Sequence, residues 1–279
     1  MKQTNIAVNK LHPFENNPYQ VRDDAEMAAL LESIQKNGIL TPLIVRSIED
    51  TDEYEVISGH RRLHAAQKAG ITEVPALIYA LDRDAAAIAV VDSNLHRDHI
   101  LPSEKAFAYK LKRDAMAHQG RTSPQLGEKS LTVEKIGAET GDSKNQVLRY
   151  IRLTHLIPEL LDLMDEGKIA LMVGEALSYL GDEEQYAVLE QCEINDCTPS
   201  YAQAVEMKKR YQDGQLTADN ISEILSREKA NQRETIKIPT EKLRKYAPNA
   251  DAKQLEDFII KACEHYRKFL IRQRNRDER

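Results

Sequence analysis

The strand-forming segments of this chain are confined to residues 1–79, and this confinement most limits the folds open to it. Short runs rich in β-branched and aromatic residues occupy 43–45, 54–57 and 74–79. An apolar pattern at helical spacing over 25–35 precedes them. We therefore predict a small mixed α/β domain at the N-terminus.

After residue 79 the sequence is typical of helices. Apolar residues recur at helical spacing over 85–94 and 103–118, and several short helices follow between 131 and 230. Residues 119–129, with two glycines and a proline, predict a loop, and a linker around 233–239 precedes a last helix that begins near Asp251. The predicted fold class is thus α+β. The predicted domains are a mixed α/β domain at 1–100, an all-α domain at 101–235 with a helix-turn-helix at about 131–153, and a C-terminal amphipathic helix with a basic tail at 236–279.

Length and composition indicate an ordinary globular protein. A chain of 279 residues can form two or three domains that each bury a core. Neither an apolar region typical of a signal peptide nor an apolar run of about 18 residues is found. Cys192, Cys197 and Cys263 are too few for a disulfide framework, and they lack the second pair that a zinc site needs. We expect a cytoplasmic protein that does not span a membrane.

The net charge of −6 conceals two basic regions. Residues 1–100 carry −5 and residues 161–235 carry −9, whereas 101–160 carry +3 and 236–279 carry +5. Screening removes the influence of acidic groups beyond a Debye length of about 8–10 Å, so local positive charge can still bind phosphates. The acidic total therefore does not exclude DNA as a partner.

The segment 57–63 predicts a strand that leads through Gly59 into a helix. Free backbone amides at such a junction, together with the helix dipole and adjacent arginines, form an anion pocket. Adjacent arginines diverge by about 100° on a helix, so at most one of Arg61 and Arg62 points at a phosphate. The alternative is that Gly59 only permits a tight turn and both arginines are solvated.

Residues 131–153 predict a helix-turn-helix. Thr132 can cap the first helix, Gly141 allows the turn, and Asp142 or Ser143 caps the second helix. Because the second helix carries amides and cations but no acidic residue, it suits the major groove of DNA. The alternative is an ordinary helical hairpin with a polar face. The candidate DNA-binding residues are Thr132, Ser143, Lys144, Asn145, Gln146, Arg149 and Arg152.

Four segments of the predicted mixed domain resemble motifs of the ParB partition family in order and spacing. They are 17–22, 37–46, 59–62 and 93–97. In the family the third reads Gly-Glu-Arg-Arg, the fourth reads Glu-Asn-x-x-Arg, and both contact phosphates. The resemblance continues through the helix-turn-helix to about residue 210.

This resemblance implies an N-terminal domain that binds CTP with magnesium, and a central domain that recognises a palindromic site in double-stranded DNA. It also implies a homodimer, associated with the nucleoid or a plasmid, that works with a ParA-type ATPase in plasmid, chromosome or mobile-element partition. Asn94 is the candidate magnesium ligand. Carried over to this chain, the candidate nucleotide-binding residues are Arg22, Gly59, His60, Arg61, Arg62, Asn94 and Arg97.

The chain departs from the family pattern at several positions. His60 and Ser93 replace two carboxylates, which weakens a magnesium site and predicts at most a weak CTPase, with no catalytic residue assigned. Val173 and Glu175 stand where a DNA-contacting segment of the family has His and Arg. An acidic residue there repels phosphate, so we expect an operator that differs from the usual partition site.

Two other functions remain open on the sequence. One is a transcriptional regulator whose N-terminal domain is a ligand-free scaffold, which CTP affinity would distinguish. The other is a phosphotransferase or nuclease of the same superfamily, but the chain offers no catalytic carboxylate or cysteine for it. A zinc site is disfavoured because His60 and His64 have no Glu between them to act as a base.

The last predicted helix has one apolar side. This side either dimerises or packs on its own protein, and the basic tail that follows suits DNA. Its apolar residues are Leu255, Phe258, Ile259, Ala262, Tyr266, Phe269 and Leu270, and its tail contains Arg272, Arg274, Arg276 and Arg279.

Overall fold

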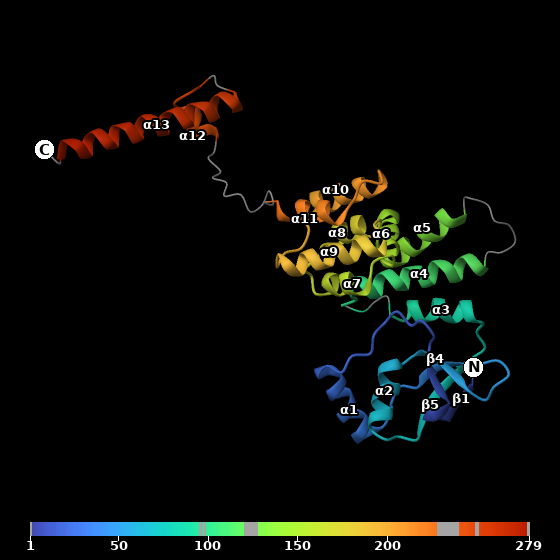
Figure 1. Cartoon of the computed structure of the whole chain (residues 1–279). Helices are drawn as coiled ribbons and strands as arrows, with labels where there is room; N and C mark the ends of the chain where they lie inside the picture. Colours follow the sequence, from blue (N-terminus) through green and yellow to red (C-terminus); the bar gives the residue numbers. More distant parts are fainter. Residues whose placement is uncertain are drawn as a thin grey trace. The chain divides into compact units, whose positions relative to one another are not determined.

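A computed structural model of the chain describes residues 2–94, 97, 99–119, 128–227, 240–248 and 251–277. The chain divides into two compact units, Met1–Arg227 and Glu228–Arg279 (Figure 1). The predicted linker at 233–239, most of the predicted loop at 119–129, His96 and the side chains of the basic tail lie outside the described residues.

One mixed sheet forms the base of the first unit. Its strands are β1 (Lys2–Ala7), β2 (Leu11–Pro13), β3 (Leu43–Ser47), β4 (Tyr54–Ser58) and β5 (Glu73–Tyr79), and the 3-10 turn η1 (Val8–Lys10) links the first two. Their order across the sheet is β1-β5-β3-β4-β2. Strands β3, β4 and β5 are the three that the sequence predicts, and they occupy the centre of the sheet. The two outer strands were not predicted.

Helices α2 (His60–Lys68) and α3 (Arg83–Asp92) contact the sheet, and α1 (Ala25–Asn37) packs on α2. Asp24 begins α1 by accepting a hydrogen bond from the backbone nitrogen of Met27 at 2.7 Å. Helix α2 places Leu63 and Ala66 in the core formed by the sheet, whereas α3 belongs to a second core that includes Ile57 of β4.

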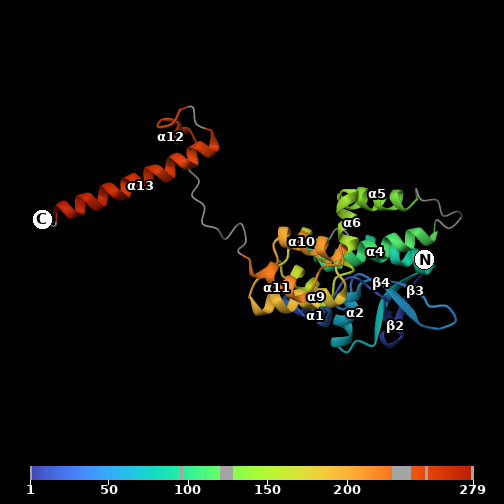
Figure 2. The ribbon, with the colours of Figure 1, turned by 45° about the horizontal axis from the view of Figure 1, so that its top comes forward.

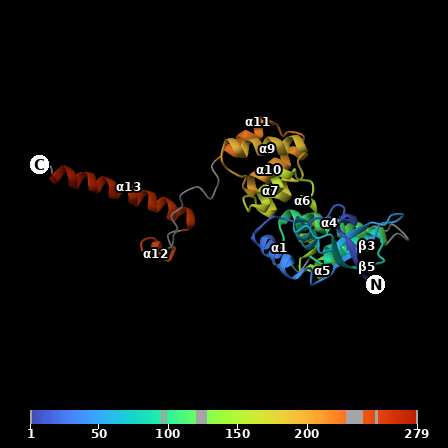
Figure 3. The ribbon, with the colours of Figure 1, turned by 90° about the horizontal axis from the view of Figure 1, so that it is seen from below.

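The rest of the described chain is helical, which confirms the predicted α+β fold class. Figure 1 shows α3 and α4 between the sheet and the later helices, Figure 2 shows α5 and α6 beside α4, and Figure 3 shows α7, α9, α10 and α11 gathered in one bundle. The helices that follow α3 in the first unit are α4 (Pro102–Gln119), α5 (Glu128–Thr140), α6 (Lys144–Leu153), α7 (Pro158–Asp165), α8 (Leu171–Leu177), α9 (Asp182–Ile194), α10 (Tyr201–Gln212) and α11 (Ala218–Ser226). The second unit contains α12 (Thr240–Arg244) and α13 (Ala252–Asp277).

Helix α4 joins the sheet region to the predicted helix-turn-helix. The side chain of Lys112 is only 3% exposed and forms ion pairs with Asp92 at the end of α3 and with Glu139 of α5. A buried ammonium group needs such partners because desolvation of an unpaired charge costs several kcal/mol. The end of α3, where the fourth family motif begins, is therefore tied through one side chain to the helix-turn-helix.

Candidate nucleotide-binding and DNA-binding sites

The turn before α2 requires glycine. Gly59 has φ +106, and a Cβ atom added there would lie 3.1 Å from the side chains of both Leu43 and Arg62. The first backbone N–H groups of α2 have no partner within the helix, as at any helix start. The strand–glycine–helix junction predicted from the sequence is confirmed, and it presents amides suited to an anion.

The two arginines after this turn have different partners. Arg62 donates to the carbonyl oxygens of Thr41 and Pro42, at 2.8 Å for Pro42, and burial lowers the pKa of its guanidinium. Arg61 instead pairs with two carboxylates of the α1 start, Glu26 at 3.0 Å and Asp24 at 3.3 Å. Arg62 thus fixes the loop before β3, whereas Arg61 must leave exposed acidic partners to reach a phosphate.

His60 is held as a neutral imidazole. Its Nε2 atom accepts a hydrogen bond from the backbone nitrogen of Phe14 at 3.3 Å. Burial, followed by the positive charge of Arg97, lowers the pKa of His60 to about 4. The residue therefore adds no charge for a phosphate near neutral pH, and it connects the segment after β2 to the start of α2.

Arg97 lies exposed close to these groups. Its guanidinium carbon is 5.8 Å from the ring centroid of Tyr19, and its charge acts on the pKa of His60. The Tyr19 hydroxyl donates to the carbonyl oxygen of Val91 at 3.4 Å, and burial raises its pKa. The structure thus brings together the first, third and fourth family motifs, which lie far apart in the sequence.

The remaining predicted residues of this site make local contacts. The Asn94 side-chain amide donates to the carbonyl oxygen of Val90 at 2.9 Å and to the Ser93 hydroxyl at 3.1 Å. Arg22 is exposed and donates to the Gln20 side chain at 3.3 and 3.4 Å. Neither residue is engaged in an ion pair among the described residues.

A magnesium ion does not fit the described part of this site. The carboxylate of Glu104 already accepts hydrogen bonds from the backbone nitrogens of Gln20 and Leu101, and Asp92 is paired with Lys112. Because magnesium relies on carboxylate ligands, the described residues support a phosphate site more than a metal site.

Sequence analysis missed two residues of this site. Tyr19 lies under Arg97, and the buried Glu104 fixes the backbone at Gln20 across 84 positions of sequence. Tyr19 stands within a family motif, but the motif does not reveal its cation contact. The hydrogen bond between Glu104 and Gln20 joins residues so far apart in the sequence that no helical or strand periodicity predicts it.

The turn of the predicted helix-turn-helix is closely packed. A Cβ atom at Gly137 would lie 2.5 Å from the carbonyl oxygen of Asp142, and Gly141 has φ +78. The Tyr109 hydroxyl donates to the Asp142 carboxylate at 2.6 Å, and Lys105 pairs with that carboxylate at 2.7 Å. Helix α4 therefore contacts the turn through two polar side chains.

The caps of α5 and α6 differ in part from the prediction. Ser143, rather than Asp142, caps α6 by accepting from the backbone nitrogen of Gln146 at 3.3 Å. The expectation that Thr132 caps the first helix is wrong, because α5 already begins at Glu128. Thr132 lies one turn inside the helix, where the residues before it also adopt helical geometry.

Helix α6 buries one side and exposes its first turn. Val147 and Ile151 are buried, Asn145 is exposed, and Lys144 pairs with Glu134 of α5 at 2.9 Å. This amphipathic arrangement leaves polar groups at the helix start available for a partner.

The two arginines of α6 contact the segment around α8. The Arg149 Nε atom lies 3.6 Å from the Glu175 carboxylate. Arg152 donates to the carbonyl oxygen of Ser178 at 2.8 Å and lies 4.1 Å from the Tyr179 ring centroid. Glu175, the acidic residue that departs from the family pattern, is thus the ion-pair partner of Arg149, a candidate DNA-binding residue.

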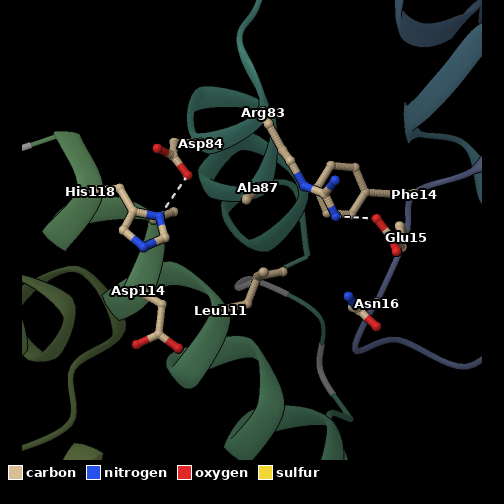
Figure 4. A pocket seen from close by; sticks show the side chains of 10 residues that line it. Phe14, Glu15, Asn16, Arg83, Asp84, Ala87, Leu111, Asp114 and His118 are labelled. Atoms are coloured by element: carbon tan, nitrogen blue, oxygen red, sulfur yellow. Dashed lines mark hydrogen bonds and ion pairs between the residues drawn. The ribbon is translucent and has the colours of Figure 1, made fainter. Parts of the chain in front are cut away.

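A polar pocket lies between α3, α4 and the segment after β2 (Figure 4). Its charged side chains are paired: Arg83 bonds to Glu15, the His118 Nδ1 atom lies 3.2 Å from Asp84, and Asp114 pairs with Arg113 outside the lining. The lining includes none of the residues that the sequence predicts for nucleotide or DNA binding. The full lining comprises Phe14, Glu15, Asn16, Arg83, Asp84, Ala87, Leu111, Asp114, Ala115 and His118.

Within the described residues, no helix is long and apolar enough to cross a bilayer.

Among the solved structures that resemble the chain are two of one protein. One is the C-terminally truncated chromosome-partitioning protein ParB from Caulobacter crescentus complexed to the centromeric parS site, with 22% identity, coverage of 80% of this chain and 98% of that chain, and a TM-score of 0.42. The other is the same truncated protein complexed with CTP-gamma-S, with 26% identity, coverage of 68% and 98%, and a TM-score of 0.33.

Sequence comparison gives the firmer relationship. The family model described as the ParB N-terminal domain matches residues 2–95. The chain is 33% identical over 206 residues to the chromosome-partitioning protein Spo0J of Thermus thermophilus, an alignment that covers 74% of this chain and 70% of that protein. The chain therefore belongs to the ParB family of chromosome-partitioning proteins.

Proposed function

We propose that this protein binds a specific DNA site to partition a chromosome, plasmid or mobile element, and that its N-terminal region binds CTP. The first turn of α6 carries the DNA-binding part of the proposal. Ser143 caps this helix, Asn145 and Gln146 occupy its first turn, and residues 144–152 include no acidic side chain. Amide side chains recognise adenine edges, and cations contact phosphates.

The partners follow from the family and from this helix. Double-stranded DNA with a palindromic site requires two copies of α6, which a homodimer supplies. A ParA-type ATPase is the further partner that partition requires. Such a protein is associated with the nucleoid or with a plasmid.

The nucleotide part of the proposal places the triphosphate at the start of α2. The helix-start amides after Gly59 and the exposed guanidinium of Arg97 would hold its oxygens, and Arg61 would join them by leaving Asp24 and Glu26. Each charge-assisted hydrogen bond contributes about 1.5–3 kcal/mol. With His60 and Ser93 in place of carboxylates, we expect slow or undetectable hydrolysis.

Arg97→Ala is expected to lower CTP affinity about 10- to 100-fold, which corresponds to the loss of one charge-assisted hydrogen bond. Titration calorimetry of the full chain with CTP, ATP, GTP and UTP, in the presence of bound DNA, measures this effect and the nucleotide preference. Arg83→Ala is the matched control, because this arginine bonds to Glu15 in the polar pocket.

Absence of heat from CTP with the wild type would contradict the nucleotide proposal and favour a regulator with a ligand-free scaffold. Rapid phosphate release would contradict the expected slow hydrolysis.

Glu175→Gln is expected to raise DNA affinity by about two- to fivefold, because the substitution frees Arg149 from a partly exposed ion pair worth up to about 1 kcal/mol. Arg149→Ala should instead weaken binding and reduce the salt dependence by about one unit of log–log slope. Fluorescence anisotropy over a series of salt concentrations measures both effects.

Gln146→Ala provides the complementary test, since it should relax sequence preference without changing the salt slope. Wild-type behaviour of both Arg149→Ala and Gln146→Ala would contradict the assignment of α6.

Mapping of the DNA bound by the full chain in cells tests the proposal as a whole. A small set of enriched sites with a shared palindrome is expected, and these sites supply the DNA for the titrations. Uniform coverage of the DNA would contradict sequence-specific binding.

A further inference from the structure

Two cations share one aromatic ring beside the candidate recognition helix. The Tyr179 ring follows α8, and its centroid lies 4.1 Å from the Arg152 guanidinium carbon and 3.4 Å from the Lys208 Nζ atom. Arg152 belongs to α6 and Lys208 to α10, and both helices contact α8 (Figure 1). All three side chains are half-buried. We call these three residues the Tyr179 patch.

The Tyr179 patch contains positive charge that no carboxylate neutralises. Among the described residues, neither Arg152 nor Lys208 forms an ion pair, although residues 161–235 carry a net charge of −9. Nearby Arg149 and Arg210, by contrast, each pair with a glutamate. A ring contact stabilises each cation by about 0.5–2 kcal/mol but leaves its charge available to an anion.

Further cations extend this positive region. His155 is exposed after α6, and its pKa is lowered by desolvation and then by the charges of Arg152, Lys110 and Arg113. Lys110 and Arg113 belong to α4, but Arg113 pairs with Asp114 at 2.7 Å, so Lys110 is the cation that α4 adds to those of α6 and α10. The ordered contact of Arg152 with Ser178 also pre-orients its guanidinium at this place.

We propose that the Tyr179 patch binds a phosphate of the DNA backbone, with Lys208 as a contact from outside the helix-turn-helix and Tyr179 as the residue that positions both cations. The inference rests on the proposed DNA binding. Arg152 follows Arg149 by three positions on α6, so the two side chains lie near one another on one side of the helix and the patch continues the candidate DNA surface. Phosphate contacts fix the register of a protein on the duplex and are independent of sequence.

Lys208→Ala tests this inference in the full chain with a duplex of mixed sequence. The log–log slope of affinity against salt concentration is expected to become shallower by about 0.9, the value for one lost phosphate contact. Lys208→Arg should keep the wild-type slope. Lys209→Ala is the matched control, because it removes the adjacent exposed lysine, which points about 100° away on the helix.

Tyr179→Leu separates positioning from a general structural role. The variant retains both cations, yet the log–log slope of DNA affinity against salt concentration should become shallower, as it does in Lys208→Ala. Thermal unfolding of the variant shows whether the fold is kept. An unchanged slope in Lys208→Ala, or an equal loss in Lys209→Ala, would overturn the inference. A wild type that binds no DNA would instead overturn the proposed function itself.

Discussion

Removal of residues 240–279 is expected to convert a dimer into a monomer and to lower affinity for a palindromic DNA site about 10²- to 10⁴-fold. When one copy of a dimer has bound its half-site, the other copy binds the second half-site intramolecularly. Two separate monomers lose this gain in affinity. Helix α13 offers an exposed apolar surface through which two copies could dimerise. Its large apolar side chains are more than one-third exposed: Phe258 at 37%, Tyr266 at 62%, Phe269 at 52% and Leu270 at 45%. Analytical ultracentrifugation and DNA titration measure the two effects.

A full-length variant makes the same test without truncation. Tyr266 and Phe269 stack with ring centroids 6.3 Å apart, and the double substitution Tyr266→Asp and Phe269→Asp should also produce a monomer. Glu264→Ala, on the opposite side of α13, should leave the dimer intact. A truncated chain that still sediments as a dimer would show that α13 does not join the two copies.

Lowering the pH from 6.5 to 4 is expected to remove up to about 3 kcal/mol of stability through His60 alone. The pKa of His60 is about 4 in the folded chain, against an ordinary value of 6.5. Between these values the unfolded chain binds a proton that the folded chain does not. The His60 contribution is therefore complete above pH 6.5 and is lost as the pH falls towards the folded pKa.

Urea unfolding of wild type and His60→Gln at several pH values isolates this contribution from that of other groups. Glutamine can accept the hydrogen bond from the Phe14 nitrogen but does not titrate, so the variant should gain stability relative to wild type as the pH falls. His99→Gln, at an exposed histidine, is the control. A constant difference between wild type and His60→Gln across the pH range would refute a neutral, buried His60.

The predictable strands are those with buried apolar runs. Leu43 and Val45 of β3 and Val74 of β5 are fully buried, so their side chains reveal the strands directly. Strand β1 pairs along its whole length with β5, yet of its residues only Ile6 is described as buried. An edge strand is held by backbone hydrogen bonds and exposes polar side chains, so its sequence lacks the usual pattern.

The sequence by itself determined the local features of both candidate sites. Gly59 between a strand and a helix, the capped start of α6 and the absence of acidic residues along α6 follow from backbone conformation, capping and composition, which act over a few residues. The family motifs indicated the order of the candidate phosphate-binding segments. These features were therefore readable before the fold was known.

Only the tertiary structure decided which partner each charged side chain has. Arg62 is committed to the carbonyl oxygens before β3, Arg149 faces Glu175, and Lys208 shares the Tyr179 ring with Arg152. These partners are brought together by the packing of whole helices and strands, and their separation in sequence follows no period. For the same reason burial, rather than residue type, sets the neutral state of His60, because desolvation disfavours its charged form.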